Sequence, residues 1–401
     1  MNKILLALVL GCSVSSVALA GGYQLQEYSA VNLGRAFGGA GVVGDDYSAI
    51  AFNPAGMSLK GTGGQVGGSF MDIRGHGDGL LRTPAGAPAS PEGKGKLRTN
   101  ALLPHFFAQT KAGERVRIGA GVYVPFGLGT YYKKGWYGAS HALNSEISVI
   151  SSAVAASVKV TDELSVGASA FMQYLDARLT NATGTVESDL NADGWKPGYS
   201  LGVMYEPVKD TRLGVSYRSK VAHRIKGNHY FHYMGTSGNC GTKLVLPEHV
   251  LFSATQKLGD FDVSGIARWT RWKRFSILRI HSEAYPGGNL PEVNEDWRNT
   301  WTIGGGVDYH YNPNWTYRAG LAWDQGAVRR PANRTARVPD SNRVQASVGL
   351  SYTKSNWQFD VGYMHLFWKR CHSHNQNGAT VLDAKYNVRM DILSAGVQYN
   401  F

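Results

Sequence analysis

Apolar and polar residues alternate along most of this chain from about residue 65 onward. One example is the stretch LSVGASAFMQ at residues 164–173, and similar stretches cover residues 301–310, 344–352 and 393–401. A repeat of two residues places apolar side chains on one face of a β-strand and polar side chains on the other. The pattern therefore predicts an all-β protein.

Two kinds of connection separate the predicted strands. Six short turns lie near residues 112–114, 161–163, 209–211, 258–260, 312–314 and 354–356. Seven longer polar connections alternate with them, at about residues 75–97, 130–145, 179–193, 231–245, 283–297, 329–342 and 371–383. Thirteen connections join fourteen strands. Short turns that alternate with long loops are typical of a transmembrane antiparallel β-barrel whose short turns face the periplasm.

The predicted inward face of these strands is too polar for a packed core. It carries Arg212, Arg218, Arg268, Asp308, His310, Arg318, Asp324 and Asp360. A barrel of fourteen strands is too wide for side chains to fill, so its lumen must be open or plugged. The residues before the first strand are glycine-rich and contain an Asn-Pro-Ala turn at residues 53–55. We expect this compact segment to form a plug in the lumen.

The first twenty residues match a secretory signal peptide. Lys3 precedes an apolar run, and Ala18-Leu19-Ala20 forms a small-x-small cleavage site. Cys12 leaves a lipoprotein open as an alternative. We expect three parts: a signal peptide at residues 1–20, a plug at residues 21–61 and a barrel at residues 62–401. The predicted location is the bacterial outer membrane.

Composition supports an exported membrane protein. The chain has 50 Gly, 21 Tyr and 10 Trp, and its charged fraction is 17%, below the roughly 25% of soluble domains. Composition alone also allows a large secreted β-sandwich or β-helix. The net charge of +12 indicates attraction to anionic lipid or solutes rather than to nucleic acid, which an exported chain rarely meets. Trp315 and Trp357 beside short turns predict an interfacial girdle, and terminal Phe401 is typical of barrels inserted by the outer-membrane assembly machinery.

Five stretches resemble one family of outer-membrane proteins. GGYQLQEYSAVNLGRAFGGAGVVGDDYSAIAFNPAGMSL (residues 21–59) is similar to the N-terminal hatch of the FadL-type long-chain fatty acid transporters. YVPFGLGTYY (123–132), LPEHVLFS (246–253), NWTYRAGLAWD (314–324) and VPDSNR (338–343) also resemble that family, in the same order. The resemblance implies a barrel of fourteen strands with a hatch in its lumen, which agrees with the strand count.

The resemblance also implies passive uptake of hydrophobic molecules, with long-chain fatty acids as the first prediction and aromatic hydrocarbons as the alternative. Capture would occur at extracellular loops, binding in an apolar pocket under the hatch, and release through a lateral gap at a kinked third strand. Gly119, Gly121 and Pro125 weaken pairing in that strand and mark the predicted gap. The predicted hatch and gating residues are Tyr23, Leu33, Gly34, Arg35, Phe52, Asn53, Pro54, Ala55 and Met57. The alternative for Tyr23, Phe52, Pro54 and Met57 is that they only pack the plug against the wall.

Two cysteines remain after the predicted cleavage. An oxidising compartment permits a disulfide between Cys240 and Cys371. The CHSH stretch at residues 371–374 fits no established zinc spacing, and HSHNQNG lacks the serine that outer-membrane phospholipases require. We therefore predict no metal, no cofactor and no enzyme activity.

One predicted external loop is strongly basic. Arg329, Arg330, Arg334 and Arg337 are expected to contact lipopolysaccharide phosphates, because a guanidinium pairs with phosphate through two parallel hydrogen bonds. The alternative is a solvated basic loop. We expect a monomer that binds no nucleic acid. A general porin or a surface barrel acting as an adhesin remains the alternative function, and a porin would need an open lumen.

Overall fold

The computed structural model of the chain describes residues 22–401. The predicted signal peptide at residues 1–20, with Cys12, lies outside the described residues. The first strands are β1 (Gly63–Arg82), β2 (Gly93–Lys111), β3 (Val116–Tyr131), β4 (Asn144–Lys159), β5 (Leu164–Thr183), β6 (Val186–Val208), β7 (Thr211–Arg218), β8 (Val221–His232), β9 (Thr236–Leu246) and β10 (His249–Leu258). They are followed by β11 (Phe261–Thr270), β12 (Ile277–Leu278), β13 (Ile280–Ser282), β14 (Val293–Asn294), β15 (Thr300–His310), β16 (Trp315–Asp324), β17 (Arg343–Lys354), β18 (Trp357–Trp368), β19 (Cys371–Asn377) and β20 (Thr380–Asn400).

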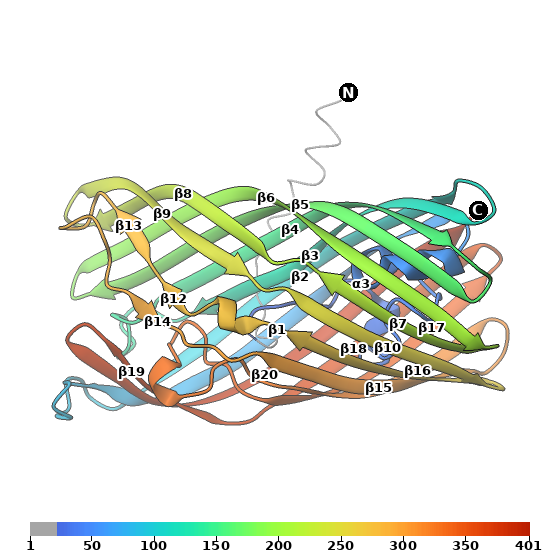
Figure 1. The fold of residues 1–401 in the computed structure, drawn as a ribbon. Helices are drawn as coiled ribbons and strands as arrows, with labels where there is room; N and C mark the ends of the chain where they lie inside the picture. The colour runs from blue at the N-terminus through green and yellow to red at the C-terminus, as the bar shows by residue number, and fades with distance from the viewer. Residues whose placement is uncertain (1–21) are drawn as a thin grey trace.

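Eighteen of these segments form one antiparallel sheet that closes into a barrel of fourteen strands. Three strands are each interrupted by two residues, which divides them into β7 and β8, β9 and β10, and β18 and β19, while β13 is a short addition in a loop. The sheet closes where β1 pairs with β20, from Gly63 opposite Asn400 to Arg82 opposite Val381. The predicted fold class is confirmed (Figure 1).

The two ends of the barrel differ, and the difference gives its orientation. All six short turns lie where the sequence predicts them, at the end of the barrel that also holds the C-terminus (Figure 1). Three of the seven predicted long loops are wrong, and a fourth, predicted at residues 75–97, is shorter because β1 continues to Arg82 and β2 begins at Gly93. Residues 179–193, 231–245 and 371–383 instead form long hairpins with tight tips at 184–185, 233–235 and 378–379. Backbone pairing continues there beyond the membrane, where both faces can be polar.

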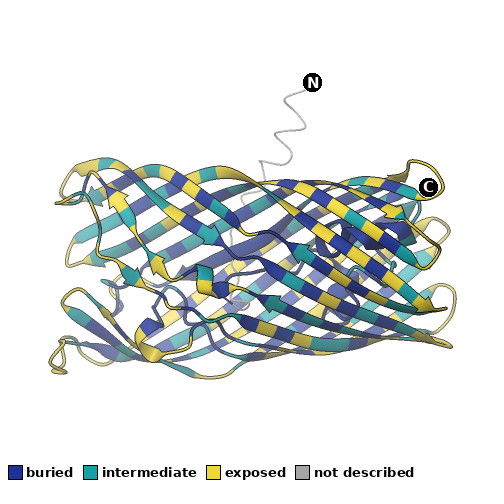
Figure 2. Cartoon of the chain, in the orientation of Figure 1, coloured by how far each residue is buried: buried dark blue, intermediate teal, exposed yellow. Residues whose placement is uncertain are grey.

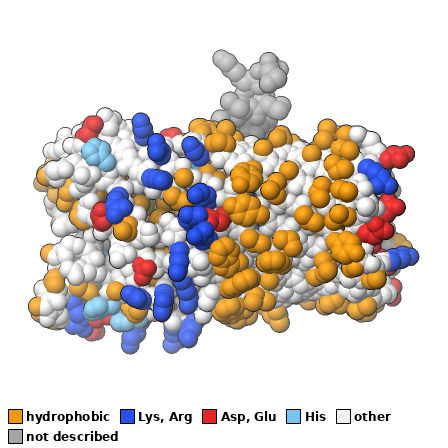
Figure 3. All heavy atoms as spheres, in the orientation of Figure 1, with side chains coloured by type: hydrophobic (Ala, Val, Ile, Leu, Met, Phe, Trp, Pro, Cys, Tyr) orange, Lys and Arg blue, Asp and Glu red, His pale blue; other side chains and the backbone are white. Residues whose placement is uncertain are grey.

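Buried and exposed residues alternate along the strands (Figure 2), so successive side chains face the lumen and the outer surface in turn. The outer surface carries a broad belt of hydrophobic side chains (Figure 3), including Val154 at 62% and Leu321 at 63% exposure. An outward apolar belt and a polar lumen are the arrangement that a lipid bilayer selects. The predicted inward residues Arg268, Asp308 and Asp324 are all buried.

Three short helical segments precede the barrel wall: α2 (Ala30–Gly34), α3 (Ala49–Phe52) and the 3-10 helix η1 (Pro54–Leu59). Two further 3-10 turns lie in loops, η2 (Trp272–Arg274) and η3 (Pro331–Asn333). None of the helices in the described part of the chain is long and apolar enough to cross a membrane.

Candidate functional site

The N-terminal segment (residues 22–62) lies inside the barrel and bonds to strands around its circumference. Ser69 of β1 donates to the carbonyl of Glu27, and Ser347 of β17 donates to the carbonyl of Gly34. Ser216 of β7 donates to the carbonyl of Phe52 at 2.6 Å. Residues 22–40 and 46–57 are buried throughout. The segment is therefore enclosed by the barrel wall and bonded to strands on several sides of it, as expected for the predicted plug.

Arg35, predicted as a hatch residue, joins the segment to the wall through a buried cluster of four charges. Its guanidinium contacts Asp45 at 2.6 Å and Asp308 of β15 at 2.8 Å. Arg318 of β16 contacts the same two carboxylates at 3.2 and 3.1 Å. Burial alone would raise the pKa of Asp45, but the two guanidinium groups hold it well below its usual range. We call these four residues the ion quartet.

Glycines in the wall allow the segment to approach the backbone beside the quartet. A Cβ atom on Gly320 would lie 2.2 Å from the carbonyl carbon of Arg35, and one on Gly306 would lie 2.4 Å from its oxygen. Gly349 similarly faces Gly34, whose own Cβ position lies 2.8 Å from the Gly349 Cα. Only bare backbone leaves room for Gly34 and Arg35 in this position.

The Asn-Pro-Ala turn packs in a similar way against glycines of β5 and β6, on another side of the lumen. The Asn53 side chain accepts from the Ala55 backbone N–H at 3.1 Å, which caps η1, and donates to the carbonyl of Val203 in β6 at 3.1 Å. A Cβ on Gly202 would lie 2.0 Å from Asn53 Oδ1, and one on Gly167 would lie 2.4 Å from the Ala55 nitrogen. Pro54 stands at the first position of η1, where its missing N–H costs nothing.

Tyr23 occupies an aromatic cage. Its ring centroid lies 4.9 Å from Trp272, 5.7 Å from Trp297, 5.9 Å from Phe275 and 6.1 Å from Phe126. All four contacts are edge-on, the preferred geometry for aromatic pairs. Tyr23 is 1% exposed, and its hydroxyl has no protein partner within residues 22–401. The cage therefore holds an aromatic ring supplied by the chain itself.

A buried carboxyl lies beside the cage. Glu295 accepts from Trp297 Nε1 at 2.9 Å. Burial raises the pKa of Glu295 to about 7, although the Trp297 hydrogen bond and the charge of Arg337 oppose the shift. Its charge therefore changes within the physiological pH range.

The backbone next to Tyr23 pairs with β3 from inside the barrel. The Leu25 N–H donates to the Pro125 carbonyl at 2.8 Å, and the Gly127 N–H donates to the Tyr23 carbonyl at 2.9 Å. The register between β3 and β4 shifts between Tyr123 and Phe126, where β3 contains one extra residue. This bulge bends β3 inward, and both faces of residues 123–130 are buried.

The inward bend interrupts the backbone pairing between β2 and β3. Their ladder ends at the pair Phe106 and Val122, and the next contact is an isolated bridge between Leu97 and Tyr132. Within the described chain, residues 98–105 and 123–131 are therefore not paired with each other. We call this stretch the lateral window. Its inner rim includes Ala101, Leu103, Phe107, Tyr123 and Phe126, all buried.

The three residues predicted to mark a gap have different positions. Pro125 lies at the bend, whereas Gly119 and Gly121 lie below the window, in the part of β3 that pairs with β2. A Cβ on Gly121 would meet the Phe107 ring at 2.3 Å. Gly121 therefore makes room for an inner side chain rather than breaking the ladder.

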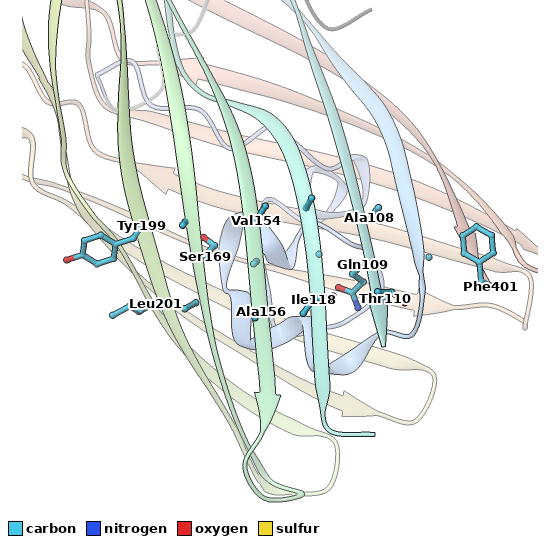
Figure 4. Close-up of a pocket in the computed structure, with 16 residues that line it drawn as sticks. Ala108, Gln109, Thr110, Ile118, Val154, Ala156, Ser169, Tyr199, Leu201 and Phe401 are labelled. Carbon is cyan, nitrogen blue, oxygen red and sulfur yellow. The ribbon is translucent and has the colours of Figure 1, made fainter. Parts of the chain in front are cut away.

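A depression of about 1020 Å³ lies on the outer surface just below the window. Small residues of β2 to β5 form its floor, and Ile118, Val154, Tyr199, Leu201 and Phe401 are among its larger lining residues (Figure 4). These larger side chains are outward and exposed. The depression therefore faces lipid and is not the apolar pocket predicted under the hatch.

The predicted disulfide is not formed. Cys240 and Cys371 are both free. Cys240 lies in β9, which pairs with β8 and β13, whereas Cys371 lies in β19, which pairs with β20. Their thiols instead point to the carbonyls of Asn191 and Pro339, each at 3.7 Å.

Two of the four arginines predicted to contact lipopolysaccharide point into the protein. Arg334 donates to the carbonyls of Asp340 and Val328 at 2.9 and 3.1 Å. Arg337 donates to Ser145 Oγ at 2.8 Å. The prediction is wrong for Arg334 and Arg337, because these hydrogen bonds hold their guanidinium groups within the protein. Arg329 and Arg330 are exposed.

Comparisons with known proteins agree with this architecture. Residues 11–401 match the family model described as outer membrane protein transport protein (OMPP1/FadL/TodX). The chain belongs to this family. It is 26% identical to the long-chain fatty acid transport protein of Escherichia coli O6:H1, over 88% of each chain. It is 25% identical to outer membrane protein P1 of Haemophilus influenzae, again over 88% of each chain.

Solved structures of the OMPP1/FadL/TodX family have the same fold. A Pseudomonas aeruginosa FadL homologue aligns with a TM-score of 0.87 at 24% identity, over 94% of this chain and 99% of the other. The Ralstonia pickettii toluene transporter TbuX aligns with a TM-score of 0.66 at 17% identity, over 97% and 99%. Membership of the family places the chain in the bacterial outer membrane as a transport protein.

Sequence reasoning missed several residues of this FadL-type site. Trp272 and Trp297 of the cage lie in the long loop region between β11 and β15, where nothing in the local pattern predicts that they meet Tyr23. Pro104 in β2 was a usable signal, since a proline inside a strand indicates an edge that lacks a neighbour. It lies on the rim of the lateral window, opposite Gly68 of β1.

Proposed function

We propose that the chain carries hydrophobic molecules passively across the outer membrane and releases them sideways through the lateral window. The observation that carries this proposal is the unpaired stretch between β2 and β3. In a closed barrel every strand bonds to both neighbours, because lipid offers no replacement partner. An opening at this depth is tolerated where β3 turns inward and the N-terminal segment satisfies its backbone.

The window opens into the hydrocarbon layer. Leu102 and Phe106 of β2 point outward beside it and are 48% and 49% exposed. Arg98 lies at its extracellular end and is exposed. A solute leaving between these residues would enter the outer leaflet without crossing a polar layer. The ion quartet and the close packing against wall glycines hold the N-terminal segment on the periplasmic side of the window. The direct route along the barrel axis is therefore filled.

Long-chain fatty acids are the substrate that we propose first. Relatives bearing that description match most of this chain. Arg218 supports a ligand with a carboxylate, because its guanidinium is buried at the inner wall and has no acidic partner in the described chain. It donates to the Tyr123 hydroxyl at 2.5 Å and lies 3.8 Å from the Phe171 ring centroid. A cation beside apolar rings suits a fatty acid head and the start of its chain.

Aromatic hydrocarbons are the second candidate. The cage around Tyr23 favours them, because four aromatic side chains already enclose one six-membered ring. Mass spectrometry of ligand that co-purifies with the protein would distinguish the two classes. A tightly held fatty acid supports the first proposal, and an aromatic compound supports the second.

Deleting Pro125 tests the lateral route. The deletion removes the extra residue of the bulge, so β3 can run straight and pair with β2 along the window. We expect uptake of a radiolabelled long-chain fatty acid to fall sharply at unchanged surface abundance. Deleting Gly287 is the matched control, because this residue lies in an external loop with open space around its Cβ position.

Equal uptake in both deletion variants and the wild type would reject lateral release. Single-channel recording tests the remaining alternative of a general porin. We expect no large stable ion current from the intact protein, since the N-terminal segment fills the lumen.

A further inference from the structure

A group of basic side chains projects from the outer surface of β8 and β9. Its members are Arg224, Lys226 and Lys243, and we call it the basic patch. Figure 3 shows Lys and Arg side chains gathered in a band across this face, between the hydrophobic belt and the polar extracellular end. All three side chains are exposed, whereas the alternate residues His223 and Leu244 point into the lumen and are buried.

The patch is unfavourable for the protein alone. Arg224 lies directly opposite Lys243 in the ladder between β8 and β9, and like charges in this position destabilise a sheet. No member of the patch forms an ion pair with another residue in the range 22–401. Asp193 lies opposite Lys226 at the edge of the patch, with Asp176 beyond it on β5, whereas Arg224 and Lys243 face no acidic residue in the ladder between β8 and β9. The arrangement is therefore short of negative charge.

The height of the patch corresponds to the lipid headgroups. On its periplasmic side the next outward residues are the apolar Ala222 and Val245, which lie opposite each other. Lys220 follows Ala222 as a separate exposed charge, before Val215 and Leu213 of the hydrophobic belt. Trp195 of β6 is 63% exposed and packs 4.9 Å from the Tyr174 ring. Outward-facing Trp and Tyr residues are typical of the boundary between hydrocarbon and headgroups. Because Asp193 is opposite Lys226, Trp195 two residues further on is level with Arg224, and the patch lies at this boundary in the half of the barrel that carries the long loops.

A second row with the same layout crosses the barrel wall elsewhere. Arg98, Arg74 and Arg389 are directly opposite one another on β2, β1 and β20. Four residues further along each strand toward the periplasm, Leu102, Phe70 and Leu393 begin the hydrophobic belt. Asp72 contacts Arg74 and lies 4.0 Å from Arg98, so this row is partly neutralised. The basic patch on β8 and β9 therefore has the stronger need for an external anion.

We propose that the basic patch binds the phosphate groups of lipopolysaccharide in the outer leaflet. Phosphates are dianionic, present three acceptor oxygens and pair well with guanidinium and ammonium groups. Two phosphates on one lipid anchor can each contact Arg224 or Lys243 and remove the repulsion between them. The site is distinct from the exposed loop arginines Arg329 and Arg330, and it is independent of the transport route.

The test compares two triple variants purified in mild detergent. Arg224→Gln, Lys226→Gln and Lys243→Gln together remove three charges from the patch. The control replaces Lys209, Lys257 and Lys354 by Gln, which removes three exposed charges at the opposite, short-turn end. Binding of purified lipopolysaccharide is measured by titration. A charge near a lipid surface contributes about fivefold in affinity, so we expect the patch variant to bind roughly a hundredfold more weakly and the control to bind normally.

Two further probes identify the source of the phosphate. Lipopolysaccharide stripped of its lipid A phosphates should bind the wild type as weakly as intact lipopolysaccharide binds the patch variant. Inorganic phosphate at the same concentration should not displace the lipid. Equal binding of stripped and intact lipid, or displacement by inorganic phosphate, would overturn the assignment.

A single variant separates binding from folding. Lys243→Gln relieves the repulsion with Arg224, so the lipid-free barrel should melt at a higher temperature than the wild type. The same variant should bind lipopolysaccharide about fivefold more weakly. A purely structural role for Lys243 predicts a lower melting temperature and unchanged binding, and that result would reject the proposal.

Discussion

Gly202→Ala should release the Asn-Pro-Ala turn from the wall without unfolding the barrel. The added Cβ would lie 2.0 Å from Asn53 Oδ1, so the Asn53 amide cannot keep its present position in the packed lumen. Asn53 must move, and it then loses its hydrogen bonds to Val203 and Ala55, each 3.1 Å long.

The expected cost follows from these two bonds. Each contributes about 1 kcal/mol, so detachment of the turn becomes easier by roughly 2 kcal/mol, or about thirtyfold in population. The barrel itself should not weaken, because alanine in a strand costs less backbone entropy than glycine. Gly265→Ala is the matched control, because Gly265 lies in the wall beside the same segment. The nearest heavy atom to its Cβ position is 3.9 Å away.

Hydrogen–deuterium exchange measures the effect directly. Amides of residues 48–60 should exchange about thirtyfold faster in Gly202→Ala than in the wild type. Exchange of the strand amides should stay unchanged, and so should the electrophoretic mobility of the folded barrel before heating. If the amides of the turn exchange at the same rate in Gly202→Ala, Gly265→Ala and the wild type, the close-approach argument is refuted.

Three further predictions concern the site. Pro54→Gly loosens the turn by about 1 kcal/mol through chain entropy, so fatty acid uptake should fall at normal surface abundance; unchanged uptake would show that the turn only fills space. Arg218→Gln removes the proposed carboxylate partner and should weaken fatty acid binding by about 2 kcal/mol, or roughly thirtyfold, but leave binding of an uncharged hydrocarbon intact; an equal loss for both ligands would contradict that role. Because the pKa of Glu295 is raised to about 7, packing of the cage is fully favourable below pH 4.5 and weakens by about 3 kcal/mol as pH rises to 7 and above. Acrylamide quenching of tryptophan fluorescence should therefore increase over that range in the wild type and not in Glu295→Gln, and a flat wild-type profile would disprove it.

The barrel could be predicted from the sequence because a membrane imposes a strict pattern on its strands. Alternation with a period of two predicted the β-strands, thirteen connections gave their number as fourteen, and all six short turns were placed correctly. The hairpins at residues 179–193, 231–245 and 371–383 were predicted as loops, since strands that extend into water on both faces lose the apolar signal. Pairing there depends on the neighbouring strand, which a local pattern cannot show.

The site was only partly predictable for a similar reason. Arg35 and Asn53 stood out through the family resemblance, but their partners Asp308 and Gly202 lie far away in the chain. A glycine in a strand does not reveal which residue approaches it. The basic loop showed the opposite problem, because four arginines in one segment do not indicate that Arg334 and Arg337 turn inward to backbone carbonyls and to Ser145.

The ion quartet has a consequence for the environments in which the protein can work. Its two guanidinium groups and two carboxylates cancel in charge, and the side chains of Arg35, Asp308 and Arg318 are at most 3% exposed. Mobile ions screen exposed charges within about 10 Å at 0.1 M salt, but they screen buried pairs much less. The attachment of the N-terminal segment to the wall should therefore be nearly the same in fresh water and in brine, although the outer surface of the cell meets every change in salinity directly.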